Sequence, residues 1–268
     1  MSYVEVQYQM SERHACRLMG LGRSTHRYRA RKAERDAALR TRLRELAAKR
    51  MRFGYRRLTA LLLREGMAAN HKRVYRLYRE EGLAMRIRAR RRIRWNGRVT
   101  SRAAVRPNQR WSMDFVSDCI NNGRVIRMLT VVDDCTRECP AIEVDTSLGG
   151  GRVRRVLDRI VDERGRPEAI VLDNGPEFRG RALAAWSEER GVRLEFIQPG
   201  KPVQNAYAES FNGRLRDECL NANWFTSLRD ARRKIETWRQ DYNQQRPHSS
   251  LDYLPPAEFA REAAEMMA

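Results

Sequence analysis

Several features common in secreted and membrane proteins are missing from this sequence. The 268 residues include five cysteines, an odd number with no Cys-x-x-Cys pair, so we expect reduced thiols rather than a disulfide framework. No apolar stretch approaches the roughly 20 residues needed to cross a bilayer. The first ten residues also lack the basic and apolar regions of a secretory signal. These absences favour a cytosolic protein with no membrane partner.

Acidic residues are scarce in the first two fifths of the chain. Residues 1–110 contain 31 Lys and Arg against 8 Asp and Glu, a net charge of +23, whereas residues 111–268 contain 23 against 26, a net charge of −3. The formal net charge of +20 therefore comes entirely from the N-terminal part. This asymmetry predicts a polyanion-binding front end joined to a nearly neutral globular body. The alternative is a basic surface without a polyanionic partner.

Helical patterns fill the basic region. In residues 11–30, two short helical segments around a Gly-Leu-Gly turn have a helix-turn-helix layout, although an ordinary helical hairpin has the same pattern. Residues 33–50 predict a charged helix, and residues 51–84 predict two more, the second capped by Asn70. The arginine-rich run at 86–95 is too charged to bury. We expect it to lie along phosphates, with a solvated arm as the alternative.

From about residue 107 the pattern changes to alternating strands and helices. Three candidate strands are followed by helix, strand, helix and strand, an order that implies a mixed sheet covered by helices. A further amphipathic helix and a Pro-bounded coil end the chain. The candidate strands are 111–116, 125–132, 141–144, 170–172 and 194–197.

Three carboxylates occupy positions unusual for surface acids. Asp114 lies inside an apolar strand, Asp173 follows the apolar run 170–172, and Glu209 lies on a helix that begins near residue 204. On that helix the apolar stripe and Glu209 are about 100° apart, so one face can pack while its neighbour presents the carboxylate. A chance acid on a surface helix is the less favoured interpretation.

Clustered carboxylates of this kind need a cation. Burying an unpaired carboxylate costs several kcal/mol, and three acids together would raise one another's pKa unless a divalent ion favoured their ionised forms. Oxygen-only ligands suit Mg²⁺ or Mn²⁺. We expect no zinc, because His14, His26 and Cys16 have no partner at zinc-like spacing. Two such ions about 3.5–4 Å apart can promote in-line displacement at a phosphodiester.

The segments around these acids resemble the DDE motifs of the retroviral-integrase superfamily. The similarity is greatest to the catalytic second-frame (OrfB-type) transposases of two-frame bacterial insertion sequences. Thirty-five residues separate Asp173 from Glu209, which is the spacing of that family, and Arg216 matches its basic position. Residues 243–251 resemble its C-terminal YN..RPH..L motif. The three matching segments are WSMDF at 111–115, LDNGPEF at 172–178 and NAYAESFNG at 205–213.

The resemblance implies an α/β protein with an RNase H-like catalytic core at 107–222, in which Asp114, Asp173 and Glu209 act on two Mg²⁺ or Mn²⁺ ions. Water would nick the transposon DNA ends, and the freed 3′-OH would then attack target DNA. The remaining parts are a helix-turn-helix-like segment (1–50), a second helical DNA-binding segment with a basic linker (51–106) and a C-terminal helix with a Pro-rich tail (223–268). Expected DNA contacts are Arg216, Lys201, Gln204, Asn205, Arg90, Arg91 and Arg92.

The same resemblance implies double-stranded DNA as partner, a homo-oligomer on DNA, a partner protein from an upstream reading frame, and a place in the bacterial cytoplasm at the nucleoid. The chain lacks the His-His-Cys-Cys zinc module of the retroviral relatives. Two alternatives are an RNase H-like nuclease without strand transfer and a non-catalytic DNA-binding regulator. The basic front end argues against the first, and the intact acids argue against the second.

Overall fold

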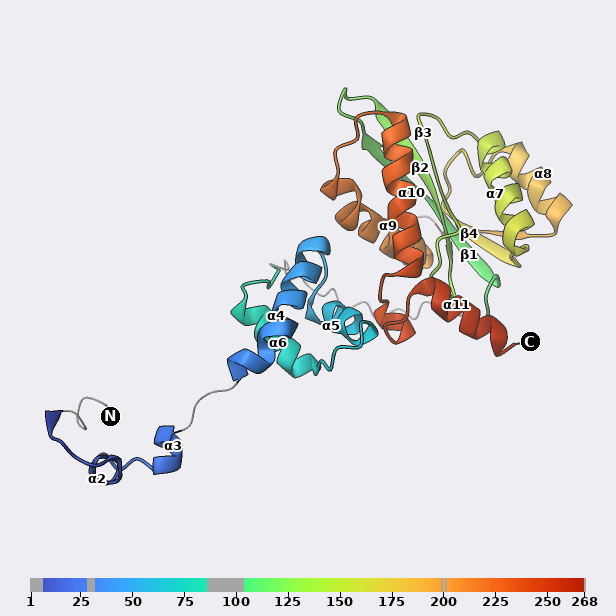
Figure 1. Ribbon diagram of the computed structural model, residues 1–268. Helices are drawn as coiled ribbons and strands as arrows, with labels where there is room; N and C mark the ends of the chain where they lie inside the picture. Colours follow the sequence, from blue (N-terminus) through green and yellow to red (C-terminus); the bar gives the residue numbers. More distant parts are fainter. Residues whose placement is uncertain (1–6, 28–31, 86–103, 199, 201, 268) are drawn as a thin grey trace.

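The computed structural model describes residues 7–27, 32–85, 104–198, 200 and 202–267 (Figure 1). Four of the expected DNA-contacting residues lie outside these described ranges. They are Arg90, Arg91, Arg92 and Lys201.

In the described part of the chain, five helices precede the sheet. Two short ones, α2 (Glu12–Leu18) and α3 (Arg23–Arg27), come first, followed by α4 (Lys32–Lys49), α5 (Tyr55–Arg64) and α6 (His71–Glu80). The last three share one apolar core, whose residues lie on both sides of residue 50. These are Leu39, Leu43, Leu46, Phe53, Leu58, Leu62, Val74, Leu77 and Tyr78.

The cap predicted for the third helix of this bundle is confirmed. The Asn70 side-chain oxygen accepts a hydrogen bond from the backbone N–H of Lys72 at 2.9 Å, which satisfies one of the free donors at the start of α6.

A five-stranded mixed sheet follows, as predicted. The strands are β1 (Arg110–Cys119), β2 (Val125–Asp133), β3 (Ala141–Asp145), β4 (Ala169–Leu172) and β5 (Arg193–Phe196). Their order across the sheet is β3-β2-β1-β4-β5. The β1–β2 and β2–β3 pairs are antiparallel, whereas β1–β4 and β4–β5 are parallel.

Helices cover both faces of the sheet (Figure 1). On one face, α7 (Gly150–Arg164) and α8 (Arg181–Arg190) pack on the buried side chains of β1, β2 and β4. On the other, α9 (Ala206–Glu218) and α10 (Leu228–Gln244) pack on the opposite side of β1 and β2. The result is a three-layer α/β/α core, the RNase H-like arrangement that was expected.

Two adjacent aspartates at the end of β2, Asp133 and Asp134, are structural. The Asp133 carboxylate accepts hydrogen bonds from the backbone N–H groups of Cys135 and Thr136 at 2.8 and 3.0 Å. Asp134 is buried and accepts from the hydroxyl of Ser112 and the guanidinium of Arg110, both at 2.6 Å. Neither carboxylate is available to compete for a metal.

The C-terminal tail differs from the prediction. The coil expected around the two prolines is partly helical, because α11 (Pro256–Glu265) begins there. Proline is tolerated in the first turn of a helix, where its missing N–H would have no partner in any case. The three short 3₁₀ turns of the described residues are Pro202–Asn205, Leu220–Ala222 and Ser249–Leu251.

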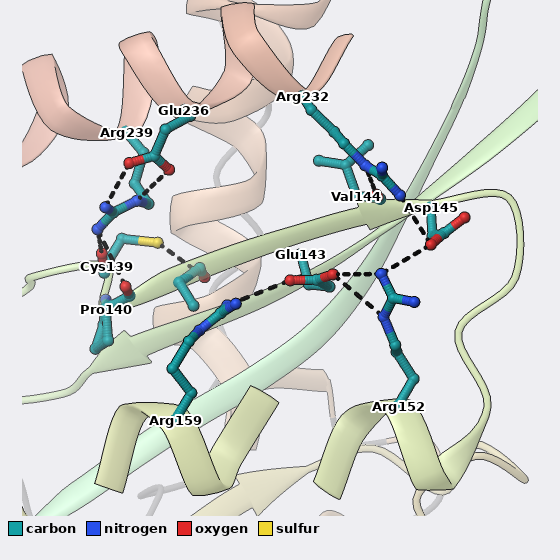
Figure 2. Close-up of polar contacts among 11 residues, drawn as sticks. Cys139, Pro140, Glu143, Val144, Asp145, Arg152, Arg159, Arg232, Glu236 and Arg239 are labelled. Carbon is teal, nitrogen blue, oxygen red and sulfur yellow. Dashed lines mark hydrogen bonds and ion pairs between the residues drawn. The ribbon is translucent and has the colours of Figure 1, made fainter. Parts of the chain in front are cut away.

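Arginines from two helices hold the edge strand β3 (Figure 2). From α7, Arg152 and Arg159 bind the carboxylate of Glu143 at 2.8 and 3.2 Å. From α10, Arg232 donates to the carbonyl oxygen of Val144 at 2.8 Å and to the Asp145 carboxylate at 2.9 Å. The edge of the sheet is thereby tied to both helical layers.

Ion pairs also link the helical bundle to α9, α10 and α11. Arg64 contacts Glu258 at 2.7 Å, and Arg57 lies 3.7 Å from Glu218. A further pair, bidentate, joins Arg50 to Asp241 of α10. Among the described residues, no helix is both long enough and apolar enough to cross a bilayer.

Candidate active site

Strand register brings two of the predicted catalytic acids together. In the parallel pair, Ser112 of β1 lies opposite Val171 of β4. Continuing that register by two residues sets Asp114 level with Asp173, which directly follows β4. Adjacent strands are about 4.8 Å apart, so the two residues lie at the same level on neighbouring parts of the sheet although 58 residues lie between them.

The Asp114 side chain is held by hydrogen bonds at both oxygens. One accepts from the backbone N–H of Phe115 and the other from the side-chain amide of Asn212, each at 2.8 Å. The amide oxygen of Asn212 in turn accepts from the Thr130 hydroxyl at 2.9 Å. This chain of contacts crosses from β2 to α9 and fixes the orientation of the carboxylate.

Asn212 also orients the helix that carries the third acid. It lies three residues after Glu209 in α9, and residues at this spacing share a helix face. The contact with Asp114 therefore turns the Glu209 face toward β1. No pattern in the sequence indicated that Asn212 binds Asp114.

Electrostatics support the same grouping. Burial raises the pKa of the Asp114 carboxyl, and the negative charges of Asp173 and Glu209 raise it further. The Glu209 side chain is on an exposed residue of the first turn of α9, and its partial burial raises its pKa as well. The charges of Asp173 and Glu209 are therefore close enough to act on the Asp114 carboxylate.

The side chains as they stand do not close into a metal cage. Within the described part of the chain, no three His, Cys, Asp or Glu side chains lie close enough to hold an ion. Asp114 and Asp173 are engaged instead in local hydrogen bonds, the second with the backbone N–H of Gly175 at 2.9 Å. The predicted acids share a location, but their carboxylates are not gathered at coordination distance.

The loop after Asp173 requires glycine. A Cβ atom at Gly175 would lie 3.0 Å from the Asp173 carboxylate and 3.3 Å from that of Glu177, both tighter than ordinary contacts. Glycine thus lets the backbone N–H approach the carboxylate. The Asn174 amide donates to the carbonyl oxygen of Ile197 at 2.7 Å, which joins the loop to the chain beyond β5.

Aromatic and ionic contacts press this loop onto the sheet. The rings of Phe115 and Phe178 stack with their centroids 4.9 Å apart. Arg127 of β2 lies 4.5 Å over the Phe115 ring and contacts Glu177 at 2.5 Å. The two phenylalanines and Glu177 belong to the recognised motifs, but only the folded chain shows that they hold Asp114 and Asp173 in place.

The remaining residues expected to contact DNA differ in how far their side chains are exposed to solvent. Arg216 is exposed in the last turn of α9, and Gln204 accepts from the backbone N–H of Gln198 at 2.7 Å. Asn205 is only 3% exposed and donates to the carbonyl oxygen of Met113 at 3.0 Å. The Asn205 amide thus anchors the start of α9 on β1, and the expected DNA contact at Asn205 stays a prediction.

Comparisons with known proteins agree with this architecture. Residues 104–202 and 190–256 each match a family model described as "Integrase core domain", and residues 34–92, which span most of α4 and all of α5 and α6, match an "HTH-like domain". The chain is 54% identical over 260 residues to the insertion element IS407 uncharacterized 31.7 kDa protein of Burkholderia multivorans, with 97% of this chain and 94% of the relative covered.

More distant relatives also cover most of the chain. The putative transposase InsK for insertion sequence element IS150 of Escherichia coli is 29% identical over 221 residues, 78% of each chain. A chain of the simian T-cell lymphotropic virus intasome, solved in complex with PP2A regulatory subunit B56 gamma, has the same fold. Its TM-score is 0.54 at 15% identity, covering 81% of this chain and 74% of that one.

A mixed sheet with acids at adjacent strand positions, an integrase core and an HTH-like domain define a DNA-acting polynucleotidyl transferase of the DDE class. The chain belongs to the transposases of bacterial insertion elements.

Proposed function

We propose that this transposase cuts DNA at the ends of its element and joins each freed 3′-OH to target DNA, with Asp114, Asp173 and Glu209 as its catalytic residues. The observation that carries the proposal is the register that sets Asp114 level with Asp173 beside the helix of Glu209. Asn212 would act as a positioning residue, since it binds Asp114 and shares a helix face with Glu209.

The donor set fits two Mg²⁺ or Mn²⁺ ions. It consists of carboxylate oxygens alone. Burial, and after it the charges of Asp173 and Glu209, raise the pKa of Asp114, and a bound cation would favour the ionised carboxylate. When bound, such ions supply activation of a nucleophilic oxygen and stabilisation of the leaving oxygen. The chain itself would contribute the orientation of Asp114 through Phe115 and Asn212 and the rigid loop at Asp173.

DNA contacts and assembly complete the proposal. Arg216 and Gln204, on the helix of Glu209 and just before it, would contact the DNA near the scissile bond, together with Lys201 and the run containing Arg90, Arg91 and Arg92. We further propose that the chain acts as a homo-oligomer on DNA, with a partner protein from an upstream reading frame.

A strand-transfer assay separates this function from simple hydrolysis. A duplex with the terminal sequence of the element, labelled at its 5′ end, is incubated with the protein, Mg²⁺ and a plasmid target. Joining yields labelled products longer than the input strand. If the label appears only in shortened strands, the chain is an RNase H-like nuclease; if the strands remain intact, a DNA-binding regulator is the better description.

Metal binding can be measured without catalysis. Because a ligand that binds only the folded state raises the melting temperature, we expect millimolar Mg²⁺ to stabilise the protein relative to an ionic-strength-matched potassium salt. Asp114→Asn should remove this shift. Asp118→Asn is the matched control, since Asp118 lies on the same strand and likewise accepts the N–H of the next residue, at 2.8 Å. Equal shifts in all three proteins would contradict the proposed site.

The raised pKa of Asp114 also predicts a pH-dependent stability difference. The folded-state pKa lies above the unfolded value of about 3.9, so the ionised carboxylate costs folding free energy at neutral pH. That cost disappears as pH falls through the folded pKa, because the group then becomes protonated in the fold. In metal-free buffer, Asp114→Asn should melt higher than wild type at neutral pH, with the difference vanishing toward about pH 4. A gain independent of pH would contradict this assignment.

A further inference from the structure

A second polar cavity lies beside the helix of Glu209, away from the three acids. Its volume is about 370 Å³, and it opens between α9, the end of β2 and the C-terminal segment that resembles the YN..RPH..L motif. Two arginines, two serines, a histidine and two tyrosines supply most of its polar surface. These residues are Arg137, Arg214, Ser210, Ser250, His248, Tyr207 and Tyr242.

Neither arginine of this cavity forms an ion pair with a carboxylate of the described residues. Arg214 donates only to Ser210, at 2.7 Å to the hydroxyl and 2.9 Å to the carbonyl oxygen. Arg137 donates to the carbonyl oxygen of Asp134, and its guanidinium lies 4.0 Å from the centre of the Tyr207 ring. Both side chains are half-buried. Half-buried guanidinium groups without an anionic partner are costly, so such pairs generally mark an anion site.

The backbone around Arg137 is also unusual. Its φ angle is +63°, in the left-handed region that glycine adopts at low cost. A non-glycine residue there is strained, and strain of this kind is concentrated at functional positions. The turn holds a charged side chain over the cavity where a glycine would have satisfied the backbone.

The acids whose charges act on these arginines are already paired: Asp134, near Arg137, is bound by Arg110 at 2.6 Å, and Glu218, near Arg214, is bound by another arginine. Glu218 is bound by Arg246 through two hydrogen bonds of 2.6 and 2.7 Å. Desolvation lowers the pKa of the His248 imidazole, and the charges of four arginines, Arg57, Arg137, Arg214 and Arg246, help lower it to about 2. His248 is therefore neutral, and the four arginines lie close enough to act on its ring.

We propose that this cavity binds one phosphate group of the DNA backbone, gripped by Arg137 and Arg214 outside the three-acid site. Guanidinium groups match the oxygens of a phosphate, and the neighbouring serine hydroxyls can donate to the same group. Glu209 and Ser210 are adjacent in α9 and about 100° apart around it. A strand whose scissile bond lies at Glu209 could therefore leave a nearby phosphate in this cavity.

The proposal rests on DNA as partner but not on catalysis, so it is tested by binding in the presence of EDTA. We expect the double variant Arg137→Gln/Arg214→Gln to bind duplex DNA roughly tenfold more weakly, as for the loss of one charge-assisted contact. The slope of log affinity against log salt should become shallower by about one, equally for element-end and unrelated duplexes. Arg229→Gln, which removes one positive charge from an exposed position on α10, should leave both unchanged.

A second measurement guards against a folding artefact. Inorganic phosphate should raise the melting temperature of the wild type and of Arg229→Gln above that in chloride of equal ionic strength, but not that of the double variant. In chloride alone the double variant should melt at least as high as wild type. The reason is that Arg137 and Arg214 of the wild type form no ion pair with a carboxylate of the described residues. If DNA salt slope and phosphate shift are the same in the double variant and in Arg229→Gln, the cavity is not a phosphate site. A lower melting temperature in chloride would assign these arginines a structural role instead. If the wild type does not join strands, but the DNA salt slope and the phosphate shift differ between the variants as expected, only the proposed function is contradicted.

Discussion

Asp173→Asn is expected to abolish DNA cleavage and joining while leaving DNA affinity intact. The substitution removes a negative charge but keeps the shape of the side chain, and its oxygen can still accept the N–H of Gly175 that Asp173 accepts at 2.9 Å. The loop should therefore stay folded. If metal activation contributes about 4 kcal/mol or more to transition-state stabilisation, the rate should fall at least about a thousandfold.

The measurement compares joined product per hour with DNA affinity for the same duplex. Asp118→Asn again serves as the control, because it removes one carboxylate from β1 outside the three-acid region. Residual joining by Asp173→Asn within about tenfold of wild type would mean that the site has been assigned to the wrong residues. A joint loss of affinity and activity would point instead to a collapsed loop, which circular dichroism and melting temperature would reveal.

Arg246→Met is expected to cause the largest loss of stability. Arg246 is 1% exposed, binds Glu218 through two hydrogen bonds and approaches His248 Nε2 at 3.1 Å. Its guanidinium also lies 5.7 Å from the Phe53 ring of the helical bundle. Breaking a buried ion pair typically costs about 3–5 kcal/mol, because the remaining charge is left without its partner. The melting temperature should fall by roughly 10 °C.

A double variant tests whether the unpaired carboxylate is the cause. Adding Glu218→Gln to Arg246→Met removes the stranded charge and should restore a substantial part of the lost stability. The contact of Arg57 with Glu218 at 3.7 Å is too long to replace the lost pair. A melting temperature for Arg246→Met close to that of wild type would show that this arginine of the C-terminal motif is not structural.

Local apolar patterns predicted the strands and helices of the core, because a buried face imposes its period on the chain. The adjacency of Asp114 and Asp173 is different in kind. It depends on parallel pairing between two strands that are far apart in sequence, and no local pattern encodes that register. Only the resemblance to the DDE motifs suggested it beforehand.

Polar residues were harder to interpret. Asn205 resembles a surface residue before a helix, yet it is buried because the start of α9 rests on β1. The link from Asn212 to Asp114 depends on how α9 packs across the sheet. At the C-terminus, Pro256 suggested a break in structure, but proline also suits the first turn of a helix, and α11 begins there.

The ion pairs between the bundle and the catalytic layers reduce the positive charge that residues 1–110 can present to DNA. Arg50, Arg57 and Arg64 face Asp241, Glu218 and Glu258, so their charge is neutralised within the protein rather than offered to a nucleic acid. The field that DNA meets is correspondingly weaker than the +23 of residues 1–110 suggests. Added salt will screen these internal ion pairs as well as the contacts with DNA phosphates. A salt titration of this transposase therefore reports both on the contacts between its helical bundle and its catalytic core and on its affinity for DNA.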